Sequence, residues 1–267
     1  MTPEVKVLAR QLSEPYGTPA ALRQEVRRDS PTATTDDHRS TFISGLVCEF
    51  QHPPVHVQAF RFQVYCGECG FLDAADYPDG LEQDAYDVSS AHFVAASGGV
   101  SPAAYARLVL ASKCLDLPME AHGLRPEFDD FPQPARSESA EISRLIVDAQ
   151  YRRRRSDHPV GLPWERDPAP LRSERRCDSS QLLLTLYRQM YAYSVDHGIR
   201  FWYAAMERCL ARSLRSMGFE FKQVGSVKDY AGPVAPFVAD LRELERALAG
   251  RHPELLAWLQ RRDLAQD

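Results

Sequence analysis

The second half of the chain alternates between helix-type and strand-type apolar patterns, and this alternation restricts the fold more than any other feature. A long helix is expected from Asp178 or Ser179 to His197, where Leu182, Leu186 and nearby apolar residues form one stripe and Gly198 follows. The later segments are expected to be a strand at 199–206, a helix at 207–217, a strand at 219–224, and helices at 234–248 and 253–262. Such alternation predicts an α/β fold with a mixed central sheet between layers of helices.

The first half supplies further strands and a helix. The apolar and β-compatible segments predict strands at 42–50, 91–96, 103–110 and 141–147. The second and third of these form a pair across the Gly98-Gly99 turn, and a proline-rich connection at 113–139 leads into the fourth. A helix is expected from Gln58 to Cys69, ended by Gly70, whereas the prolines of HPPVH place His52 and His56 in a loop.

Length and composition indicate one main domain. The chain has 267 residues and 44% hydrophobic content, which suffices for one large domain or two small ones. Residues 1–40 are polar and rich in Pro, Thr, Ser and charge, so we interpret them as an extension and 41–267 as a single domain. Neither a signal peptide nor an apolar run of membrane-spanning length is evident, so a cytoplasmic protein is expected.

Positive charge is concentrated in one segment of an acidic chain. The formal net charge is −5, which argues against general nucleic-acid binding. Directly after the 141–147 strand come four arginines, Arg152, Arg153, Arg154 and Arg155. Such a run suits an anionic ligand or an acidic protein partner, and a solvated basic loop is the structural alternative.

Three acids lie close together in the segment YPDGLEQDAYD. Glu82, Asp84 and Asp87 would repel one another unless a cation is near. Calcium is one candidate, but the spacing is not that of an EF-hand loop. Pairing with arginines that stand inside apolar runs is favoured, because such arginines are costly to bury unpaired. These are Arg61, Arg107 and Arg144.

The cysteines give only a weak indication of metal binding. Six are spread along the chain, which is not the pattern of a disulfide framework. Cys66 and Cys69 form a CxxC, but no second CxxC or nearby Cys/His pair completes four ligands. We therefore expect two small side chains packed on a helix rather than a metal site.

Together, these residues resemble a known family. The order Arg61, Glu82-x-Asp84-x-x-Asp87, Arg107 and Glu141-x-Ser143-Arg144 resembles the acyl-homoserine lactone synthases, which are acyltransferases of the GNAT fold. The segments RFQVYCGECGF, SAHFVA, EISRL, HGIRFWYAAMER and DYAGPVAPF are similar to the acyltransferases associated with exosortase and PEP-CTERM systems, which are likened to long-chain N-acyl amino acid synthases. The resemblance covers about 42–259 and implies a GNAT-like domain.

One departure bears on the acyl donor. GNAT acetyltransferases carry a glycine-containing turn that holds the coenzyme A pyrophosphate, and here YRRRRSDHPVG stands in its place. An acyl thioester on acyl carrier protein lacks the free nucleotide, and carrier proteins are acidic, so the arginine run is the expected docking surface. The resemblance thus implies acyl-carrier protein as donor, with acyl-CoA possible, no tightly bound cofactor, and an amino acid as acceptor. A lipid product would allow peripheral contact with a membrane.

The resemblance also implies site roles. Glu141 is the candidate base, with pairing to Arg144 as the structural alternative. Ser143 and Arg144 are assigned to the catalytic group, Ser143 as a hydrogen-bonding partner of the acyl carbonyl or as a strand serine bonded to backbone. Arg61, Glu82, Asp84, Asp87 and Arg107 would shape the donor and acceptor sites, or stabilise the fold as an ion network. Phe201, Trp202 and Tyr203 are expected to wall the acyl tail, or to be core aromatics.

The expected function is transfer of a long-chain acyl group to the amine of an amino acid. The alternatives are a homoserine-lactone synthase, a GNAT acetyltransferase using acetyl-CoA, and a catalytically silent module that binds acyl carrier protein.

Overall fold

A computed structural model of the chain describes residues 47–48, 53–96, 102–127, 134–151, 179–230 and 232–260. These residues belong to one unit, Thr41–Asp267. The predicted extension at 1–40 and the arginine run at 152–155 lie outside the described residues. The domain boundary near residue 40 therefore stays a prediction.

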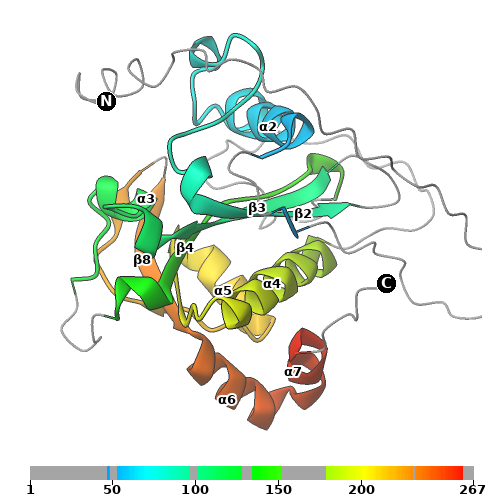
Figure 1. The fold of residues 1–267 in the computed structure, drawn as a ribbon, viewed down its shortest axis with the longest axis vertical. Coiled ribbons are helices and arrows are strands. Elements are labelled where there is room, and N and C mark those ends of the chain that lie inside the picture. The colour runs from blue at the N-terminus through cyan, green and yellow to red at the C-terminus, as the bar shows by residue number, and fades with distance from the viewer. Residues whose placement is uncertain are drawn as a thin grey trace, which may run out of the picture. The chain divides into compact units, whose positions relative to one another are not determined.

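A mixed sheet forms the centre of this unit (Figure 1). Its strand order is β1-β2-β3-β4-β5-β8-β6, with β7 also paired to β8. The β4–β5 pair is parallel and the other described pairs are antiparallel. The strands are β1 Val47–Cys48, β2 Ser90–Ala96, β3 Pro102–Leu110, β4 Ser139–Val147, β5 Phe201–Met206, β6 Lys222–Gln223, β7 Lys228–Asp229 and β8 Pro233–Asp240.

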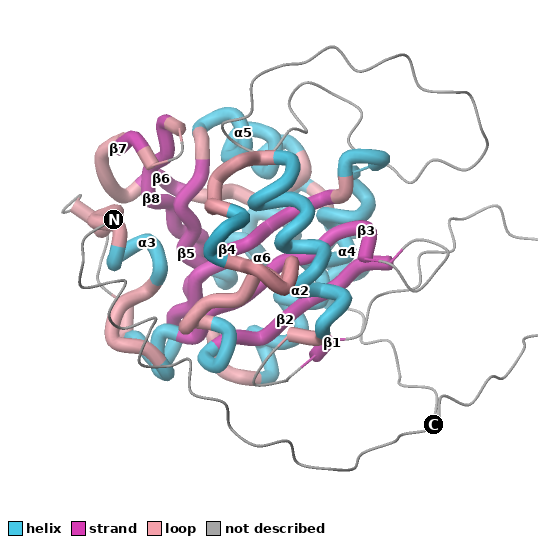
Figure 2. Tube along the Cα trace, turned by 90° about the horizontal axis from the view of Figure 1, so that it is seen from above, coloured by secondary structure: helices cyan, strands magenta, loops and turns pink. Residues whose placement is uncertain are grey.

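Helices lie on both faces of the sheet (Figures 1 and 2). The α-helices are α2 Val55–Phe62, α3 Pro118–Ala121, α4 Ser179–Asp196, α5 Arg208–Ser216, α6 Leu241–Arg251 and α7 Pro253–Gln260. The π-helix η1 Gln63–Glu68 continues α2, and short 3₁₀ turns are η2 Ala74–Asp76, η3 Asp87–Ser89, η4 Ala111–Lys113, η5 Arg136–Glu138 and η6 Ala149–Tyr151. The predicted GNAT-like α/β fold, a mixed sheet flanked by helices, is confirmed.

The main core lies between the sheet and α4. Leu182, Leu186 and Met190 of the predicted helical stripe are fully buried, and they pack in one cluster with alternate residues of the strands, among them Phe93 and Trp202. Burying side chains of this size stabilises the fold by roughly 1.5–3 kcal/mol each. The apolar side chains that recur every 3.6 residues along the helix thus pack against the side chains that point to the same face at every second residue of the strands.

The opposite face of the sheet is covered by shorter elements. Val57, Phe60 and Val64 of α2 and η1 pack against Tyr105 of β3 and Ile146 of β4. Next to them, Leu117, Met119 and Leu124 around α3 pack against residues of β3, β5 and β8. This second face carries the charged residues described below.

The expected helix at 234–248 is wrong over its first part. Residues Pro233–Asp240 form strand β8, and α6 begins only after Asp240, whose side chain accepts a hydrogen bond from the Arg242 N–H at 2.9 Å. The run PVAPFVA is apolar on both faces because both faces of β8 are covered, so periodicity alone does not separate it from a buried helix. Pro236 is the residue that would have opposed a helix there.

The loop expected at HPPVH ends earlier than predicted. Helix α2 begins at Val55, so His56 lies in its first turn, while Pro54 occupies the N-cap. A proline at a helix start is tolerated because the first N–H groups have no intrahelical partner. The connection at 113–139 also contains α3, which was not predicted. The strand expected at 219–224 is limited to Lys222–Gln223.

None of the described helices is both long enough and apolar enough to cross a membrane.

Candidate functional site

A cluster of three arginines and three acids lies on the sheet face covered by α2. Its members come from α2, the 82–87 segment, β3 and β4, and the directly bonded pair Glu82 and Arg144 is 62 positions apart in the sequence. We call it the ion cluster, and it consists of Arg61, Glu82, Asp84, Asp87, Arg107 and Arg144. The predicted pairing of the acids with internal arginines is therefore present.

Arg61 and Arg107 meet at the carboxylate of Asp87. Asp87 Oδ1 accepts from Arg61 Nη1 and from Arg107 Nη1, both at 2.7 Å. Arg61 Nε also donates to Glu82, and Arg107 Nη1 donates to Asp84 Oδ1 at 2.5 Å. The second oxygen of Asp87 accepts the Asp84 backbone N–H at 3.0 Å, which holds the acidic segment in a tight turn.

Arg144 closes the cluster on its outer side. Its Nη2 donates to Glu82 Oε1 at 3.1 Å and to Asp84 Oδ2 at 3.0 Å. Its guanidinium also lies over the Tyr65 ring, 5.0 Å from the centroid. The side chains of Arg144 and Asp84 are each 21% exposed, whereas those of Arg61, Glu82 and Arg107 are 0% exposed. Arg144 and Asp84 are thus the members of the cluster that reach the surface.

The arginines of the cluster keep Asp84 and Asp87 ionised. Burial works against the charge of Asp84, but Arg107 and Arg144 outweigh it and hold the pKa of Asp84 well below its usual range. The pKa of Asp87 is likewise lowered, since Arg61 and Arg107 overcome its desolvation. Burial also opposes the charge of Arg144, yet Glu82 and Asp84 raise its pKa. Three positive and three negative charges leave no excess charge.

Two buried guanidinium nitrogens of the cluster have no hydrogen-bond partner among the described residues. They are Arg61 Nη2 and Arg107 Nη2. Because buried donors are nearly always satisfied, each is a place for an ordered water.

Glu141 lies beside the ion cluster but is not part of it. Its carboxyl group accepts a hydrogen bond from the Met119 N–H at 2.9 Å, and Glu141 is 3% exposed. Burial raises the pKa of Glu141 to about 8, against the lowering effects of that hydrogen bond and of Arg107. The alternative of an ion pair with Arg144 is wrong, because Arg144 pairs with Glu82 and Asp84. A carboxyl group in this state exchanges protons near neutral pH.

Strand register places the candidate residues in adjoining rows on one face. Glu141 pairs with Val109 on one side and with Tyr203 on the other, and Ser143 pairs with Arg107. Residues two apart on a strand face the same side, so Arg107, Glu141 and Ser143 share the face covered by α2 and α3. The Ser143 hydroxyl accepts from Arg107 Nε at 3.0 Å. Its partner is therefore a side chain rather than the backbone expected for a strand serine.

Strand β4 is irregular beside Glu141. The register with β3 shifts between Tyr105 and Arg107, so that β4 has one extra residue there. Arg144 lies in this bulge with φ 53°, a left-handed conformation that is costly for a residue with a Cβ. Its pairing with two acids and its contact with Tyr65 compensate for that cost. Bulges of this kind often re-aim side chains at functional sites.

Strands β4 and β5 separate immediately after Glu141. Their described pairing covers only Ser139–Glu141 with Phe201–Tyr203, although β4 continues to Val147 and β5 to Met206. Beyond Glu141, the backbone N–H and C=O groups of β4 that point toward β5 therefore form no described β4–β5 ladder hydrogen bonds. Unpaired strand backbone is a ready acceptor of an extended ligand.

The three aromatic residues of β5 do not face the same side. Phe201 and Tyr203 pack in the cluster beneath α3, whereas Trp202 packs beneath α4 and donates its indole N–H to Ser194 Oγ at 2.9 Å. Trp202 is thus a core residue with a satisfied donor, and a single wall made of all three is excluded by strand alternation. Phe201 and Tyr203 remain candidates for lining the site.

Several residues around the site were not predicted. Met119 supplies the N–H to Glu141, and its short helix carried a sequence signal: Pro118 at the first helical position and Glu120, which accepts the Leu117 N–H at 2.7 Å. Tyr65 supports Arg144 because the π-helical turn η1 places it there. No local pattern in the sequence predicts that turn.

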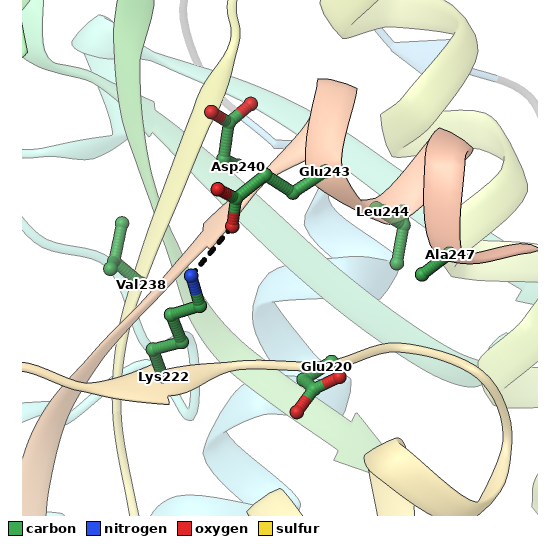
Figure 3. Close-up of a pocket in the computed structure, with 7 residues that line it drawn as sticks. All are labelled: Glu220, Lys222, Val238, Asp240, Glu243, Leu244 and Ala247. Carbon is green, nitrogen blue, oxygen red and sulfur yellow. Dashed lines mark hydrogen bonds and ion pairs between the residues drawn. The ribbon is translucent and has the colours of Figure 1, made fainter.

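A small hollow lies away from these residues, at the edge of the sheet (Figure 3). It has a volume of about 50 Å³ and lies between β6, β8 and α6. Lys222 Nζ and Glu243 Oε2 form an ion pair across it at 2.7 Å. It contains none of the predicted site residues, so it adds nothing to the candidate site. The other lining residues are Glu220, Val238, Asp240, Leu244 and Ala247.

Among the described residues, no group of His, Cys, Asp and Glu side chains is placed to hold a metal ion. Cys66 and Cys69 form no disulfide with any described residue, and they are half-buried and buried respectively. The acids of the ion cluster pair with arginine side chains and not with a metal ion.

Comparison with known proteins agrees with this geometry. The acetyltransferase (GNAT) domain family matches residues 60–159, which include the ion cluster and Glu141. This match confirms the prediction of an enzyme of the acyltransferase type. No curated protein matches the chain by sequence.

Solved structures of acyl-homoserine lactone synthases are similar in fold. BjaI, a CoA-dependent acyl-homoserine lactone synthase solved with SAM and isopentyl-CoA, has a TM-score of 0.53 at 18% identity over 75% of this chain and 81% of that chain. TofI, in a ternary complex with an inhibitor and MTA, has a TM-score of 0.54 at 16% identity over 79% and 98%. The synthase LasI has a TM-score of 0.52 at 15% identity over 73% and 87%.

Proposed function

We propose that the protein is an N-acyltransferase that moves a long-chain fatty acyl group from an acyl-carrier-protein thioester to the amine of an amino acid. The observation that carries the proposal is Glu141, a buried carboxyl group with a pKa of about 8, at the point where β4 and β5 separate. A thioester inserted between the strands would present its carbonyl beside a group able to take a proton.

The chemistry needs a base, a donor to the oxyanion and a place for the acyl chain. Glu141 takes a proton from the acceptor ammonium, directly or through a water, and the resulting amine attacks the thioester carbonyl carbon. Backbone N–H groups of β4 beyond Glu141 donate to the oxyanion. The C–S bond then breaks, and the second proton that the nitrogen loses as the amide forms passes to the departing thiolate of the carrier arm, which leaves as a thiol.

The ion cluster holds this machinery in place. Arg107 connects the cluster to β4 through Ser143, and Arg144 fixes the bulge that follows. Arg61, Glu82 and Asp87 are too deeply buried to reach a substrate without rearrangement, so their role is to position the others. Arg107 is buried as deeply as Arg61, so its Nη2, which has no partner among the described residues, is a place for an ordered water through which it would reach a substrate oxygen.

The acyl tail is assigned to the space between the separating strands, with Phe201 and Tyr203 on one side. Each methylene group buried there contributes roughly 0.8 kcal/mol. A long chain is therefore favoured over acetyl.

The carrier protein is assigned to the arginine run at 152–155, which follows the β4 strand in sequence. Reversing the charge of Arg153 and Arg154 should raise the KM for the acyl-carrier donor, and the effect should weaken at high salt. An unchanged KM with a rate insensitive to salt would contradict docking there. A cytoplasmic location, contact of the lipid product with a membrane and an association with exosortase systems remain predictions made from the sequence and its resemblance.

A homoserine-lactone synthase is the second candidate, because the structures with similar folds include such enzymes. It would use S-adenosylmethionine as acceptor, with acyl carrier protein or coenzyme A carrying the acyl donor. A GNAT acetyltransferase and a non-catalytic carrier-binding module are the remaining alternatives.

The test is product analysis by mass spectrometry. Purified protein would be incubated with acyl-carrier donors of several lengths, acyl-CoA or acetyl-CoA, together with a mixture of common amino acids or S-adenosylmethionine. An open-chain N-acyl amino acid is the expected product. A lactone formed only with S-adenosylmethionine would move the assignment to the second candidate, and carrier binding without any product would favour the non-catalytic module.

A further inference from the structure

A hydrogen-bonded His–Tyr pair lies next to the candidate site, on the solvent side. The Tyr230 hydroxyl and His122 Nε2 are 3.0 Å apart, and the two rings are stacked with centroids 4.3 Å apart. His122 follows α3 directly, three residues after Met119, whose N–H binds Glu141. Tyr230 follows β7. The pair therefore joins the turn that contacts Glu141 to a segment 108 residues away.

Further contacts hold these two segments together. Lys228 Nζ donates to the Gly123 carbonyl, next to His122. Lys228 also lies 3.4 Å from a carboxylate oxygen of Glu127. Gly123 has a φ of 74°, a left-handed conformation that favours glycine and lets the chain turn sharply after α3. The position of the imidazole is thus set by contacts on both sides.

Tyr230 lies within the electrostatic influence of the candidate site. Burial raises the pKa of its hydroxyl, and the charges of Arg144, Glu141 and Asp84 also act on it. Arg144 and Asp84 are the members of the ion cluster that reach the surface. Tyr230 is itself 46% exposed, so it also reaches solvent.

The proposed reaction releases one proton per turnover. An acceptor ammonium and a thioester give an amide, a thiol and one proton, and that proton must reach bulk water. Glu141 is 3% exposed and cannot pass it to solvent directly. Burial and the nearby Arg144 lower the pKa of His122, so its imidazole is neutral at pH 7 and is able to accept a proton.

Resting on the proposed function, we propose that Tyr230 and His122 form the route by which the proton taken up by Glu141 leaves the site. A water carries the proton from Glu141 to the Tyr230 oxygen, while the Tyr230 hydroxyl proton passes to His122 Nε2. The imidazolium then loses its Nδ1 proton to solvent, and exchange with solvent water moves the remaining ring proton from Nε2 back to Nδ1, which returns the pair to its starting state. No bond other than these O–H and N–H bonds changes.

The experiment compares turnover of His122→Ala with that of the parent enzyme at low buffer concentration, with and without added imidazole. We expect the variant to lose about 100-fold in turnover, the lower end of what a positioned proton-transfer group contributes. Added imidazole should restore turnover in a concentration-dependent way. A merely structural role of His122 would not give this rescue.

Two further variants make the result decisive. Tyr230→Phe keeps the stacked ring but removes the hydroxyl, and it should lose turnover without rescue by imidazole, because His122 is still present. His197→Ala is the matched control: His197 also stacks on a tyrosine, Tyr193, with centroids 3.8 Å apart, but it follows α4 instead of α3. It should retain parental turnover, and thermal melting would verify that all three variants are folded.

The route is wrong if folded His122→Ala turns over at the parental rate, or if imidazole does not restore its activity. Full turnover by Tyr230→Phe would also overturn it. A parent enzyme that forms no acylated product with any donor and acceptor would instead contradict the proposed function.

Discussion

Glu141 and the ion cluster differ in how the fold treats their charge. Asp84 and Asp87 lie beside arginines that lower their pKa values, so they remain ionised even in acid. Glu141 lies on the same sheet face and forms no ion pair with any described residue, and burial raises its pKa. One sheet face therefore provides two environments. In one, the carboxylates of Asp84 and Asp87 stay ionised and stabilise the fold; in the other, the carboxyl group of Glu141 can exchange a proton. This separation is how proteins assign different roles to chemically identical side chains.

Replacing Glu141 by Gln should abolish acyl transfer while leaving the fold intact, because the amide retains an acceptor for the Met119 N–H but cannot take up a proton. In the parent, the rate should rise with pH up to about 8, where the Glu141 carboxyl group becomes ionised. The measurement is the pH dependence of kcat/KM with a carrier-bound donor. A Gln variant with full turnover would remove Glu141 from the mechanism.

Removing Arg61 should cost much more stability than removing a surface arginine. Arg61→Met leaves Glu82 and Asp87 with an uncompensated buried charge, a loss of about 3–5 kcal/mol in unfolding free energy. Arg125 pairs with Asp116 at 3.2 Å, but both side chains are largely exposed, so Arg125→Met should change it by about 1 kcal/mol or less. Chemical denaturation would compare the two, and equal losses would show that the cluster is not a buried ion network.

At the scale of the element, β4 is the strand on which the site is built. It pairs with β3 on both sides of the bulge but with β5 only as far as Glu141. The bulge forces Arg144 into a left-handed conformation, and the arginine side chain is then held by Glu82 and Asp84. Local backbone strain and a specific ion pair thus occur at the same residue, next to the point where the sheet opens.

The bulge predicts an unusual order of stability for two variants. Arg144→Gly and Arg144→Ala lose the same side-chain contacts, but glycine tolerates a φ of 53° and alanine does not. The Gly variant should therefore be the more stable by about 1 kcal/mol. At Ser143, which pairs regularly with Arg107, Ser143→Ala should instead be more stable than Ser143→Gly. Urea denaturation of all four variants measures this, and the same order at both positions would argue against the bulge.

At the scale of the whole molecule, the two carboxylate environments give stability a two-sided dependence on pH. Unfolded Asp84 and Asp87 take up protons near their ordinary pKa of 3.8, whereas the folded ones resist. Stability should therefore fall as the pH drops below about 4. Glu141 acts in the opposite direction, since the folded state retains a proton that the unfolded state has lost. Its contribution should reduce stability as the pH rises from 4.5 to about 8.

Unfolding free energy measured between pH 3 and pH 9 would test both sides. Glu141→Gln should remove the decline on the alkaline side and leave the acid side unchanged. A Gln variant with the same alkaline decline as the parent would show that the buried carboxyl group is not its source.

The sequence alone determined the α/β class, most of the strands and helices of the second half, and the partners of the ion cluster. Periodic apolar patterns are local features of the sequence, and the pairing of buried arginines with acids is a pairwise requirement. Both can therefore be predicted from a single sequence. The helix expected at 234–248 failed because a strand buried on both faces has the same apolar composition as a buried helix.

Only the tertiary structure decided the surroundings of Glu141. Its partner is the backbone of Met119, and its pKa depends on the burial that α3 and β5 provide. The early separation of β4 and β5, the bulge at Arg144 and the His122–Tyr230 pair likewise depend on strand register and on contacts between distant segments. Desolvation and register arise when the chain is packed, so no local pattern of residues specifies them.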